Sequence, residues 1–414
     1  MRRTAIATFL VGPLLAAGLA SADPFDLALR AVRQADPGAG GAPAPTATPS
    51  LFGDVTGSMP GLDCLGPCTN KSAMFLDGSI ISLSATPVPQ GGGQNITFDG
   101  WSGDCTGTST CIITLSKATT VTARFTCHGW CPEQPAAELN NLNGIWGFNT
   151  SRLVAVGNAA TILQFNGTAW QRVGGITGLQ PNVNLMGVGG VAGQAIGFAV
   201  GDGGNIVMTQ DNGGLWTKNT NGQTKNLRSV WAASGTKAFA VGDEIGPNYA
   251  WQEYDGTSWN NPALSSSGIA WNSVWGFGAT QYVVVGNMGR IATVDGAAYG
   301  LPTANNSSNL HGVWGSRSSS IFIVGASSTI LSFDGSTASV VTPPLLNTTL
   351  RAIHGASPVD IYVVGDNGTV IASNGSNWNL ESFPVKNQLN GVYNFGNGNV
   401  YVVGNGGIIY HKRP

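Results

Sequence analysis

The sequence predicts an all-β protein: a seven-bladed β-propeller with four-stranded blades, preceded by a small disulfide-containing β domain. Three observations predict this fold class. An apolar run that ends in Val-Gly recurs along the chain, and its glycines lie 39 to 44 residues apart. That spacing suits a propeller blade of about 40–50 residues. All six cysteines precede the repeats. The seven repeated glycines are Gly157, Gly201, Gly242, Gly286, Gly325, Gly365 and Gly404.

Residues 1–22 have the pattern of a cleavable signal peptide. Arg2 and Arg3 form a basic region, Phe9 to Leu19 form an apolar region, and Ala20 to Ala22 suit a cleavage site. The apolar run is shorter than the about 20 residues that cross a bilayer, so we expect no transmembrane anchor. The pattern predicts export to a periplasmic, cell-surface or extracellular location.

Residues 23–51 are predicted to form a linker. Its first part, from Asp23 to Gln34, allows one or two turns of amphipathic helix. Residues 36–50 are mostly Pro, Gly, Ala and Thr, with little that a fold could bury.

The chain carries few charges, at 10% of its residues, where an average domain has about 25%. Loss of Arg2 and Arg3 with the signal peptide reduces the 19 basic residues to 17, against 21 acidic ones. No stripe of Lys and Arg is present to neutralise a phosphate backbone. We therefore expect no nucleic-acid partner.

Residues 52–126 are predicted to form a small β module. Strands are expected over Ile80 to Ala85 and Thr119 to Phe125, the second with apolar and polar residues in alternation. A stretch of about 75 residues resembles the divergent InlB B-repeat family through Gly61 to Cys64, Gly78 to Leu83, Phe98 to Cys105 and Val121 to Phe125. The resemblance implies a β-grasp-like spacer or adhesive module of secreted bacterial surface proteins, without catalytic residues. Trp101 is expected in the module core, with a sugar platform as the alternative.

The six cysteines lie in three close pairs along the chain. In an exported protein such pairs predict disulfide bonds, although fifteen connectivities are formally possible. A zinc site of four thiolates is the alternative, but the spacings are not Cys-x2-Cys and the compartment is oxidising. We expect no metal and no other cofactor. The neighbouring pairs are Cys64 with Cys68, Cys105 with Cys111, and Cys127 with Cys131.

The repeats align in columns that define four strands in each blade. Strand A starts with Leu or Trp, strand B is the Val-Gly run, strand C follows, and in most repeats an Asn-Gly or Asp-Gly turn leads to strand D. The third residue of strand A is Gly, Ser or Ala, which suits inner strands crowded around a channel. The fifth is mostly Trp, which suits packing between blades. Strand D opens with an aromatic residue at Trp170, Trp216, Trp259, Tyr299 and Trp378.

Residues 140–414 resemble the propeller family that includes the YCF48-like assembly factors and the BNR (Asp-box) repeat proteins. Thr209 to Trp216 matches an Asp-box, with Thr in place of the usual Ser and Leu in place of the usual Thr. The resemblance implies a propeller, and an Asp-box is a turn that carries no activity by itself. By this analogy an envelope-complex assembly factor is one possible function.

We find no catalytic motif in the sequence and assign no catalytic residue. Acidic residues are sparse and mostly at turns, whereas a glycosidase needs two carboxylates that face one bond. Only Arg228 and Arg351 share an inner-strand column, fewer than the three arginines of BNR-type sialidases. His354 stands in the Trp column and is expected to be a packed core residue.

Two polar columns form the candidate ligand site. The residue after each Val-Gly is Asn or Asp in six of seven repeats, and the second residue of strand A is polar in six. Both positions open on one face of a propeller, around its channel. The alternatives are that the Asn and Asp side chains cap their turns and that the strand-A residues are only solvated. The candidate ligand-binding residues are Asn143, Arg228, Asn272, His311, Arg351, Asn390, Asp202, Asp243 and Asp366.

These features favour an exported, non-enzymatic binding protein that recognises a cell-surface glycan or protein through the channel mouth. A glycan-active hydrolase or lyase of the BNR/sialidase type is one alternative, and an envelope-complex assembly factor is the other. The scarcity of convergent carboxylates and histidines favours binding. The sequence leaves the ligand and the oligomeric state open.

The domain at 127–414 carries one further prediction, about how the ring closes. The seventh repeat stops after strand C, at Ile408 to Pro414, without an Asp-Gly turn. Cys127 to Cys131 contains a Gly and a Trp spaced like the start of a strand D. We therefore predict that residues 127–137 form the outer strand of the last blade, pair with residues 407–412 and give Trp130 the place of Trp378. This closure would leave no strand edge unpaired.

Overall fold

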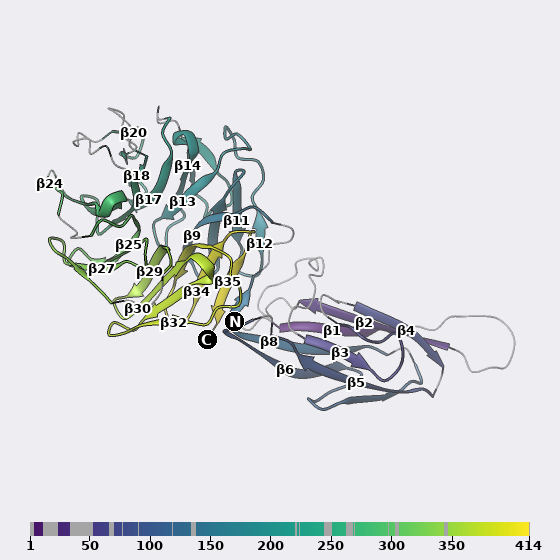
Figure 1. The fold of residues 1–414 in the computed structure, drawn as a ribbon. Helices are drawn as coiled ribbons and strands as arrows, with labels where there is room; N and C mark the ends of the chain where they lie inside the picture. Colours follow the sequence, from purple (N-terminus) through teal and green to yellow (C-terminus); the bar gives the residue numbers. More distant parts are fainter. Residues whose placement is uncertain are drawn as a thin grey trace. The chain divides into compact units, whose positions relative to one another are not determined.

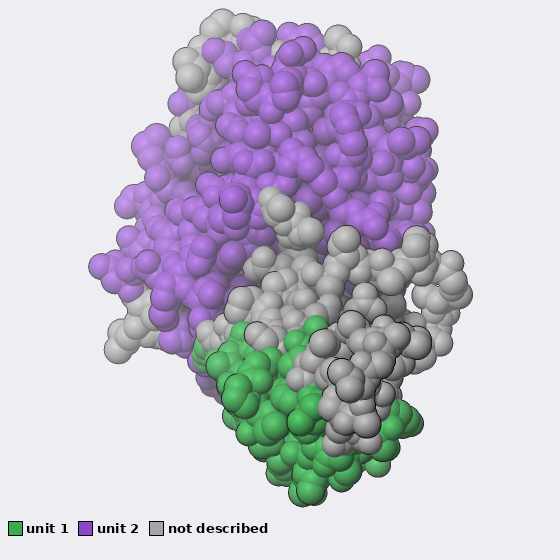
Figure 2. Space-filling view, turned by 90° about the vertical axis from the view of Figure 1, so that its right-hand side faces the viewer, with its two compact units in different colours: residues 1–131 green, residues 132–414 purple. Residues whose placement is uncertain are grey.

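A computed structural model describes residues 4–10, 24–33, 53–65, 70–76, 78–89, 91–117, 119–133, 138–219, 222, 224–243, 251–261, 268, 270–296, 298–302, 306–342 and 347–413. The chain divides into two compact units, Met1–Cys131 and Pro132–Pro414; Figure 2 colours them green and purple. Both units are built from β-strands, as Figure 1 shows.

The first unit contains two groups of antiparallel strands. A three-stranded sheet has the order β3-β5-β7, and a second set has the order β8-β1-β2-β4, with β6 paired to β8. The strands are β1 (Thr4–Leu10), β2 (Pro24–Arg33), β3 (Gly53–Gly57), β4 (Asn70–Leu76), β5 (Ile80–Pro87), β6 (Gln94–Gly103), β7 (Cys111–Thr114) and β8 (Val121–Pro132).

The core of this module forms where apolar residues alternate along its strands. Leu62, Ile81 and Phe125 are each at most 1% exposed. Trp101 is 5% exposed, and its indole N–H donates a hydrogen bond to the Ser109 carbonyl oxygen at 2.7 Å. Trp101 is therefore a core residue, and the sugar-platform alternative does not describe its position.

One expectation for the linker is wrong. Residues 24–33 form strand β2, where the sequence suggested one or two turns of helix. β2 pairs with β1 on one side and with β4 on the other. Phe25, Leu27 and Leu29 recur every second residue, which is the period of a strand, and the ladder on both sides provides partners for the backbone.

The cysteines pair with their neighbours, as expected. Cys105 is bonded to Cys111 and Cys127 to Cys131, with Cα atoms 6.0 Å apart in both. Cys64 is also in a disulfide; its predicted partner, Cys68, lies outside the described residues. Because each loop is this short, the bonds hold local turns and add little through chain entropy.

The second unit is a propeller whose blades follow one another around a ring in chain order, from blue-teal to yellow in Figure 1. Six blades are four-stranded antiparallel sheets, and the seventh has β33, β34 and β35. Blades one to three comprise β9 (Leu142–Asn149), β10 (Arg152–Gly157), β11 (Thr161–Phe165), β12 (Trp170–Arg172); β13 (Leu185–Gly190), β14 (Gly197–Gly201), β15 (Ile206–Thr209), β16 (Thr217–Asn219); β17 (Leu227–Ser234), β18 (Lys237–Gly242), β19 (Trp251–Tyr254) and β20 (Trp259–Asn260).

Blades four to seven repeat the same plan. They comprise β21 (Trp271–Gly276), β22 (Gln281–Gly286), β23 (Ile291–Asp295), β24 (Ala298–Gly300); β25 (Leu310–Arg317), β26 (Ser320–Gly325), β27 (Ile330–Phe333), β28 (Ala338–Val340); β29 (Leu350–Ser357), β30 (Asp360–Gly365), β31 (Val370–Ser373), β32 (Trp378–Glu381); β33 (Leu389–Asn394), β34 (Val400–Gly404) and β35 (Ile409–Arg413). One-turn 3-10 helices follow three of the second strands: η1 (Asp202–Gly204), η2 (Asn287–Gly289) and η3 (Asp366–Gly368).

The inner strands lie close together, as predicted from the Gly, Ser or Ala residue at the third position of each strand A. A Cβ atom added at Gly187 would lie 2.5 Å from the carbonyl oxygen of Arg228 in the next blade. At Gly391, it would lie 3.3 Å from the Cα atom of Gly144. The second contact joins blade seven to blade one, so the ring of inner strands is continuous.

The side chains at the fifth position of strand A form aromatic contacts between blades. The rings of Trp146 and Tyr393 are 5.2 Å apart, and Tyr393 stacks on His354 at 4.2 Å. His354 lies 5.7 Å from Trp275 of blade four. Its Nδ1 accepts the backbone N–H of Asn394 at 3.1 Å, so His354 is a packed core residue, as expected from its place in the column.

The seventh blade involves the segment that precedes the first repeat. Within the second unit, the backbone N–H of Glu133 donates to the Ile409 carbonyl oxygen at 2.7 Å. The Glu133 side chain is fully buried, and its Oε1 lies 2.5 Å from Nη2 of Arg413. Residues 134–137 lie outside the described residues, so closure by the whole of 127–137 stays a proposal.

The turns between the second and third strands hold two successive residues at positive φ. In blade six they are Asn367 and Gly368, with φ of 57° and 66°, and in blade one they are Ala159 and Ala160, with φ of 52° and 50°. A Cβ atom added at Gly368 would lie 1.9 Å from the Val385 carbonyl oxygen. Glycine relieves both the backbone strain and this contact.

We predict opposite effects for exchanges at the two equivalent positions. Gly368→Ala should lower the free energy of unfolding by about 2–3 kcal/mol, from strain and the forced contact. Ala160→Gly should raise it by about 0.5–1 kcal/mol, because it removes strain. Denaturant unfolding of the propeller, followed by tryptophan fluorescence, measures both. Shifts of the unfolding midpoint in the same direction would contradict the prediction.

Candidate functional site

The second residues of the seven inner strands meet in one cavity at the channel mouth. The cavity has a volume of about 360 Å³, within the usual range for small-ligand sites. A second cavity of about 210 Å³ extends along the third and fourth positions of the same strands. The mouth cavity is lined by Asn143, Met186, Asp202, Asn226, Arg228, Asp243, Asn272, His311, Arg351, Gln388 and Asn390.

The two polar columns pair with each other within a blade. In blade three, Nε of Arg228 donates to Oδ1 of Asp243 at 2.8 Å. In blade six, Nε of Arg351 donates to Oδ1 of Asp366 at 2.5 Å. Blades one, four and seven use asparagines instead, with an Nδ2 to Oδ1 distance of 2.9 Å in each pair: Asn143 to Asn158, Asn272 to Asn287, and Asn390 to Asn405.

The pairing is matched by type, since Arg faces Asp and Asn faces Asn. The side chains after Val-Gly therefore accept hydrogen bonds from the neighbouring inner strand. This arrangement differs from the turn-capping alternative, in which the same side chains would bond their own turns.

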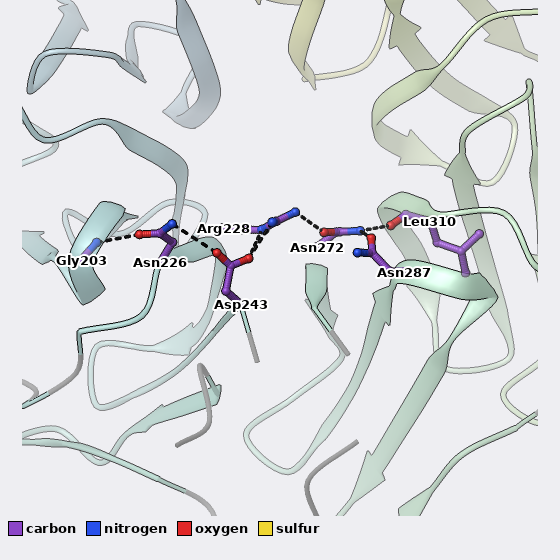
Figure 3. Close-up of polar contacts among 7 residues, drawn as sticks. All are labelled: Gly203, Asn226, Arg228, Asp243, Asn272, Asn287 and Leu310. Atoms are coloured by element: carbon purple, nitrogen blue, oxygen red, sulfur yellow. Dashed lines mark hydrogen bonds and ion pairs between the residues drawn. The ribbon is translucent and has the colours of Figure 1, made fainter. Parts of the chain in front are cut away.

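The same side chains also connect neighbouring blades. Nδ2 of Asn272 donates to the Leu310 carbonyl oxygen of blade five at 2.7 Å, and Nη1 of Arg228 donates to Oδ1 of Asn272 at 2.7 Å. Figure 3 shows this chain of contacts, which runs from Gly203 to Leu310 through Asn226, Asp243, Arg228 and Asn272. Much of the polar ring therefore stabilises the propeller itself.

A third polar column was missed at the level of sequence. Asparagine precedes strand A in four blades, and its Oδ1 accepts a backbone N–H from the turn of the preceding blade. The pairs are Asn141 with Gly406, Asn184 with Ala159, Asn226 with Gly203, and Asn309 with Met288, at 2.9 to 3.2 Å. The recurrence of Asn before the first apolar residue of strand A was the available signal. Gln388 occupies this position in blade seven and lines the cavity.

Blades two and five break the pairing rule. Blade two keeps the carboxylate of Asp202 but has Met186 where blades three and six have arginine. Asp202 accepts a hydrogen bond from Nδ2 of Asn184 at 2.8 Å. Blade five keeps a basic residue, His311, but has Ala326 where the other blades have Asn or Asp.

His311 is half-buried and has no hydrogen-bond partner among the described residues. Burial lowers the pKa of its imidazole below 6.5, and the positive charges of Arg351 and Arg228 lower it further. The ring is therefore neutral at neutral pH and offers one N–H donor. Arg351 adds further donors, since its Nη1 and Nη2 atoms bond no described residue and its side chain is 33% exposed.

Eight of the nine candidate ligand-binding residues line this cavity. Asp366 is the exception: its carboxylate accepts a hydrogen bond from the Arg351 guanidinium but does not line the cavity. In the described part of the chain no three His, Cys, Asp or Glu side chains are grouped to hold a metal ion. The helices within the described ranges are too short and polar to cross a membrane.

Comparison with known proteins supports both parts of the fold. Residues 65–128 match the family model of the divergent InlB B-repeat domain, which confirms the resemblance of the module. No curated protein matches the chain.

Solved structures similar to the chain are propellers. A structure described as YCF48 bound to D1 peptide has 14% identity and a TM-score of 0.58, and the match covers 69% of this chain and 97% of that one. YCF48 from Cyanidioschyzon merolae has 14% identity, a TM-score of 0.55, and 69% and 99% coverage. The WD40 propeller domain of Doa1 has 12% identity, a TM-score of 0.56, and 69% and 96% coverage. These likenesses confirm the propeller fold and leave the ligand undefined.

Proposed function

We propose that this is an exported, non-enzymatic protein that binds an extracellular or cell-surface ligand in the channel mouth. One observation carries the proposal: most donors of the polar ring are paired within it, but the His311 imidazole and the Nη atoms of Arg351 donate to no described residue. Both lie in the mouth cavity. Their chemistry suits a carboxylate, whether it belongs to an acidic peptide or to an acidic glycan.

The known folds support a binding role. One similar propeller is described as bound to a peptide, and propellers commonly present such a mouth to partners. The module of the divergent InlB B-repeat family supports a surface or exported location, because that family occurs in such proteins.

The carboxylates of the mouth favour binding over hydrolysis. Asp243 and Asp366 are held by arginines, at 2.6 Å and 2.5 Å. Asp202 accepts from Asn184. A glycosidase needs one carboxyl group to hold a proton and a second to act on the same bond. Asp243 and Asp366 are each committed to a guanidinium partner, so neither is placed to act on a bond of a ligand.

Binding assays with matched variants test the proposal. Arg351→Lys keeps the positive charge but loses the planar fork, and His311→Ala removes the imidazole. Each should weaken binding at least about tenfold, since hydrogen bonds to charged groups contribute about 1.5–3 kcal/mol. Arg317→Lys is the control, because Arg317 is exposed at the far end of β25 in the same blade as His311.

The assay uses the full chain against acidic peptides in one arm and a glycan array in the other. Loss of binding in Arg351→Lys and His311→Ala, with Arg317→Lys unchanged, supports the mouth site, and the responding arm identifies the source of the carboxylate. Equal binding by all variants would place the ligand elsewhere. Turnover of any glycan that disappears in the variants would reject the non-enzymatic function.

A further inference from the structure

The mouth contains two opposite mismatches in its pairing pattern, in blades two and five. Blades three and six each hold an Arg–Asp pair across the two polar columns. Blade two has the acidic member, Asp202, but no arginine. Blade five has a basic member, His311, but no carboxylate. We propose that a bound ligand supplies both missing members: an ammonium group beside Asp202 and a carboxylate beside His311.

The charges of the mouth support the first half of this inference. Arg228 is neutralised by Asp243 and Arg351 by Asp366. Asp202 has no ion pair with any described residue, and Asn184 is the one described side chain that donates to its carboxylate. A carboxylate accepts about four hydrogen bonds. With a neutral His311, the mouth therefore keeps one uncompensated negative charge, and its position is that of the missing arginine.

The donors around blade five support the second half. The His311 imidazole and the Nη atoms of Arg351 belong to adjacent blades and line the same cavity. Ala326 leaves open the place that Asp243 and Asp366 take in their own blades. A ligand carboxylate there would accept from both side chains, and the guanidinium fork suits two oxygens of one carboxylate.

The ring geometry sets the shape of the ligand. Blades two and five are separated by three steps in one direction and four in the other, so Asp202 and His311 stand nearly opposite each other. Both line a cavity of about 360 Å³. The ligand class is therefore a small peptidic zwitterion, such as a short peptide with free ends. This inference rests on the proposed function and narrows it, because an acidic glycan lacks the ammonium group.

Unblocked dipeptides and their N-acetylated and C-amidated forms test the inference, titrated into the full chain by calorimetry. The unblocked forms should bind, and each blocking group should weaken binding tenfold or more. Met186→Arg rebuilds in blade two the Arg–Asp pair of blades three and six, and Ala326→Asp places a carboxylate beside His311. Each should abolish binding by occupying one end of the site, with folding intact because other blades already carry Arg and Asp at these two positions.

Asp202→Asn separates this inference from the broader function. In this variant the unblocked and N-acetylated peptides should bind equally, at the weak affinity of the carboxylate end alone. If Met186→Arg and Asp202→Asn leave affinity unchanged while Arg351→Lys lowers it, the zwitterion is wrong and the mouth site stands. Failure of every unblocked dipeptide to bind, or equal binding of the N-acetylated forms to the wild-type chain, also overturns it. Arg317→Lys is again the control.

Discussion

Arg413→Met is expected to lower the free energy of unfolding of the propeller by about 3–5 kcal/mol. Arg413 is 7% exposed and Glu133 is 0% exposed, and their side chains meet at 2.5 Å. The substitution would leave a buried carboxylate without its cation. The imidazole of His411, 3.4 Å from the same oxygen, compensates this loss only if it is protonated. Because Glu133 lies beside the last blade, opening there should release the whole ring cooperatively.

A double-mutant cycle tests whether the loss comes from the unpaired charge. Glu133→Gln combined with Arg413→Met removes both charges and should recover most of the stability lost by Arg413→Met alone. Arg317→Met is the control at an exposed position, with an expected change within about 0.5 kcal/mol. Denaturant unfolding provides the free energies. A loss below about 1 kcal/mol for Arg413→Met would show that the ring closes without this pair.

Acid is expected to unfold the propeller through His354. Burial of its imidazole lowers the pKa of His354 from 6.5 to about 3. Between these two pKa values the unfolded chain binds a proton at this imidazole and the folded chain does not. The free energy of unfolding therefore falls as the pH drops from about 6.5 towards 3. Each pH unit in this window costs about 1.4 kcal/mol, which amounts to roughly 4–5 kcal/mol by pH 3. Protonation of Nδ1 would also break its hydrogen bond with the Asn394 N–H.

His354→Phe isolates this contribution. Phenylalanine keeps an aromatic ring against Tyr393 but cannot titrate, so the variant should lose less stability per pH unit between pH 6.5 and 5. Because the two proteins share every other titrating group, the difference in slope should rise across this window and approach about 1.4 kcal/mol per pH unit near pH 5. The variant should be less stable at pH 7, because the Asn394 N–H loses its acceptor. Equal slopes in both proteins would assign the acid sensitivity to other groups.

The repeat pattern of the sequence was sufficient for the architecture of the propeller. Three patterns depend on only a few neighbouring residues: the Val-Gly runs, the Asn-Gly and Asp-Gly turns, and the small residues at the third position of strand A. The strands and turns that they specify could therefore be predicted without knowledge of the tertiary contacts. The Asp-box at Thr209 to Trp216 is of this kind: Oδ1 of Asp211 accepts the N–H groups of Gly214 and Leu215 at 2.9 Å each. Extended residues 24–33 were not foreseen, because their strand depends on partners distant in the sequence.

The candidate site shows the same division between local and distant information. The two polar columns could be chosen from the sequence because strand alternation places them at one end of the inner strands. Their partners could not be chosen, because Arg228 and Asp243 lie on different strands and their side-chain directions decide the contact. The Asn column before strand A escaped notice because its hydrogen bonds cross from one blade to the turn of another.

The sequence by itself determined the number of blades and the end of the channel that gathers polar groups, and it predicted the two disulfide pairs that the structure shows. Only the tertiary structure decided which of those groups are already satisfied. Closing the ring brings seven equivalent positions together at the channel mouth. Each group then either finds a partner, as Arg351 finds Asp366, or finds none among the described residues, as is the case for His311. The physical reason is that only those donors and acceptors that form no hydrogen bond within the folded protein remain available to a ligand.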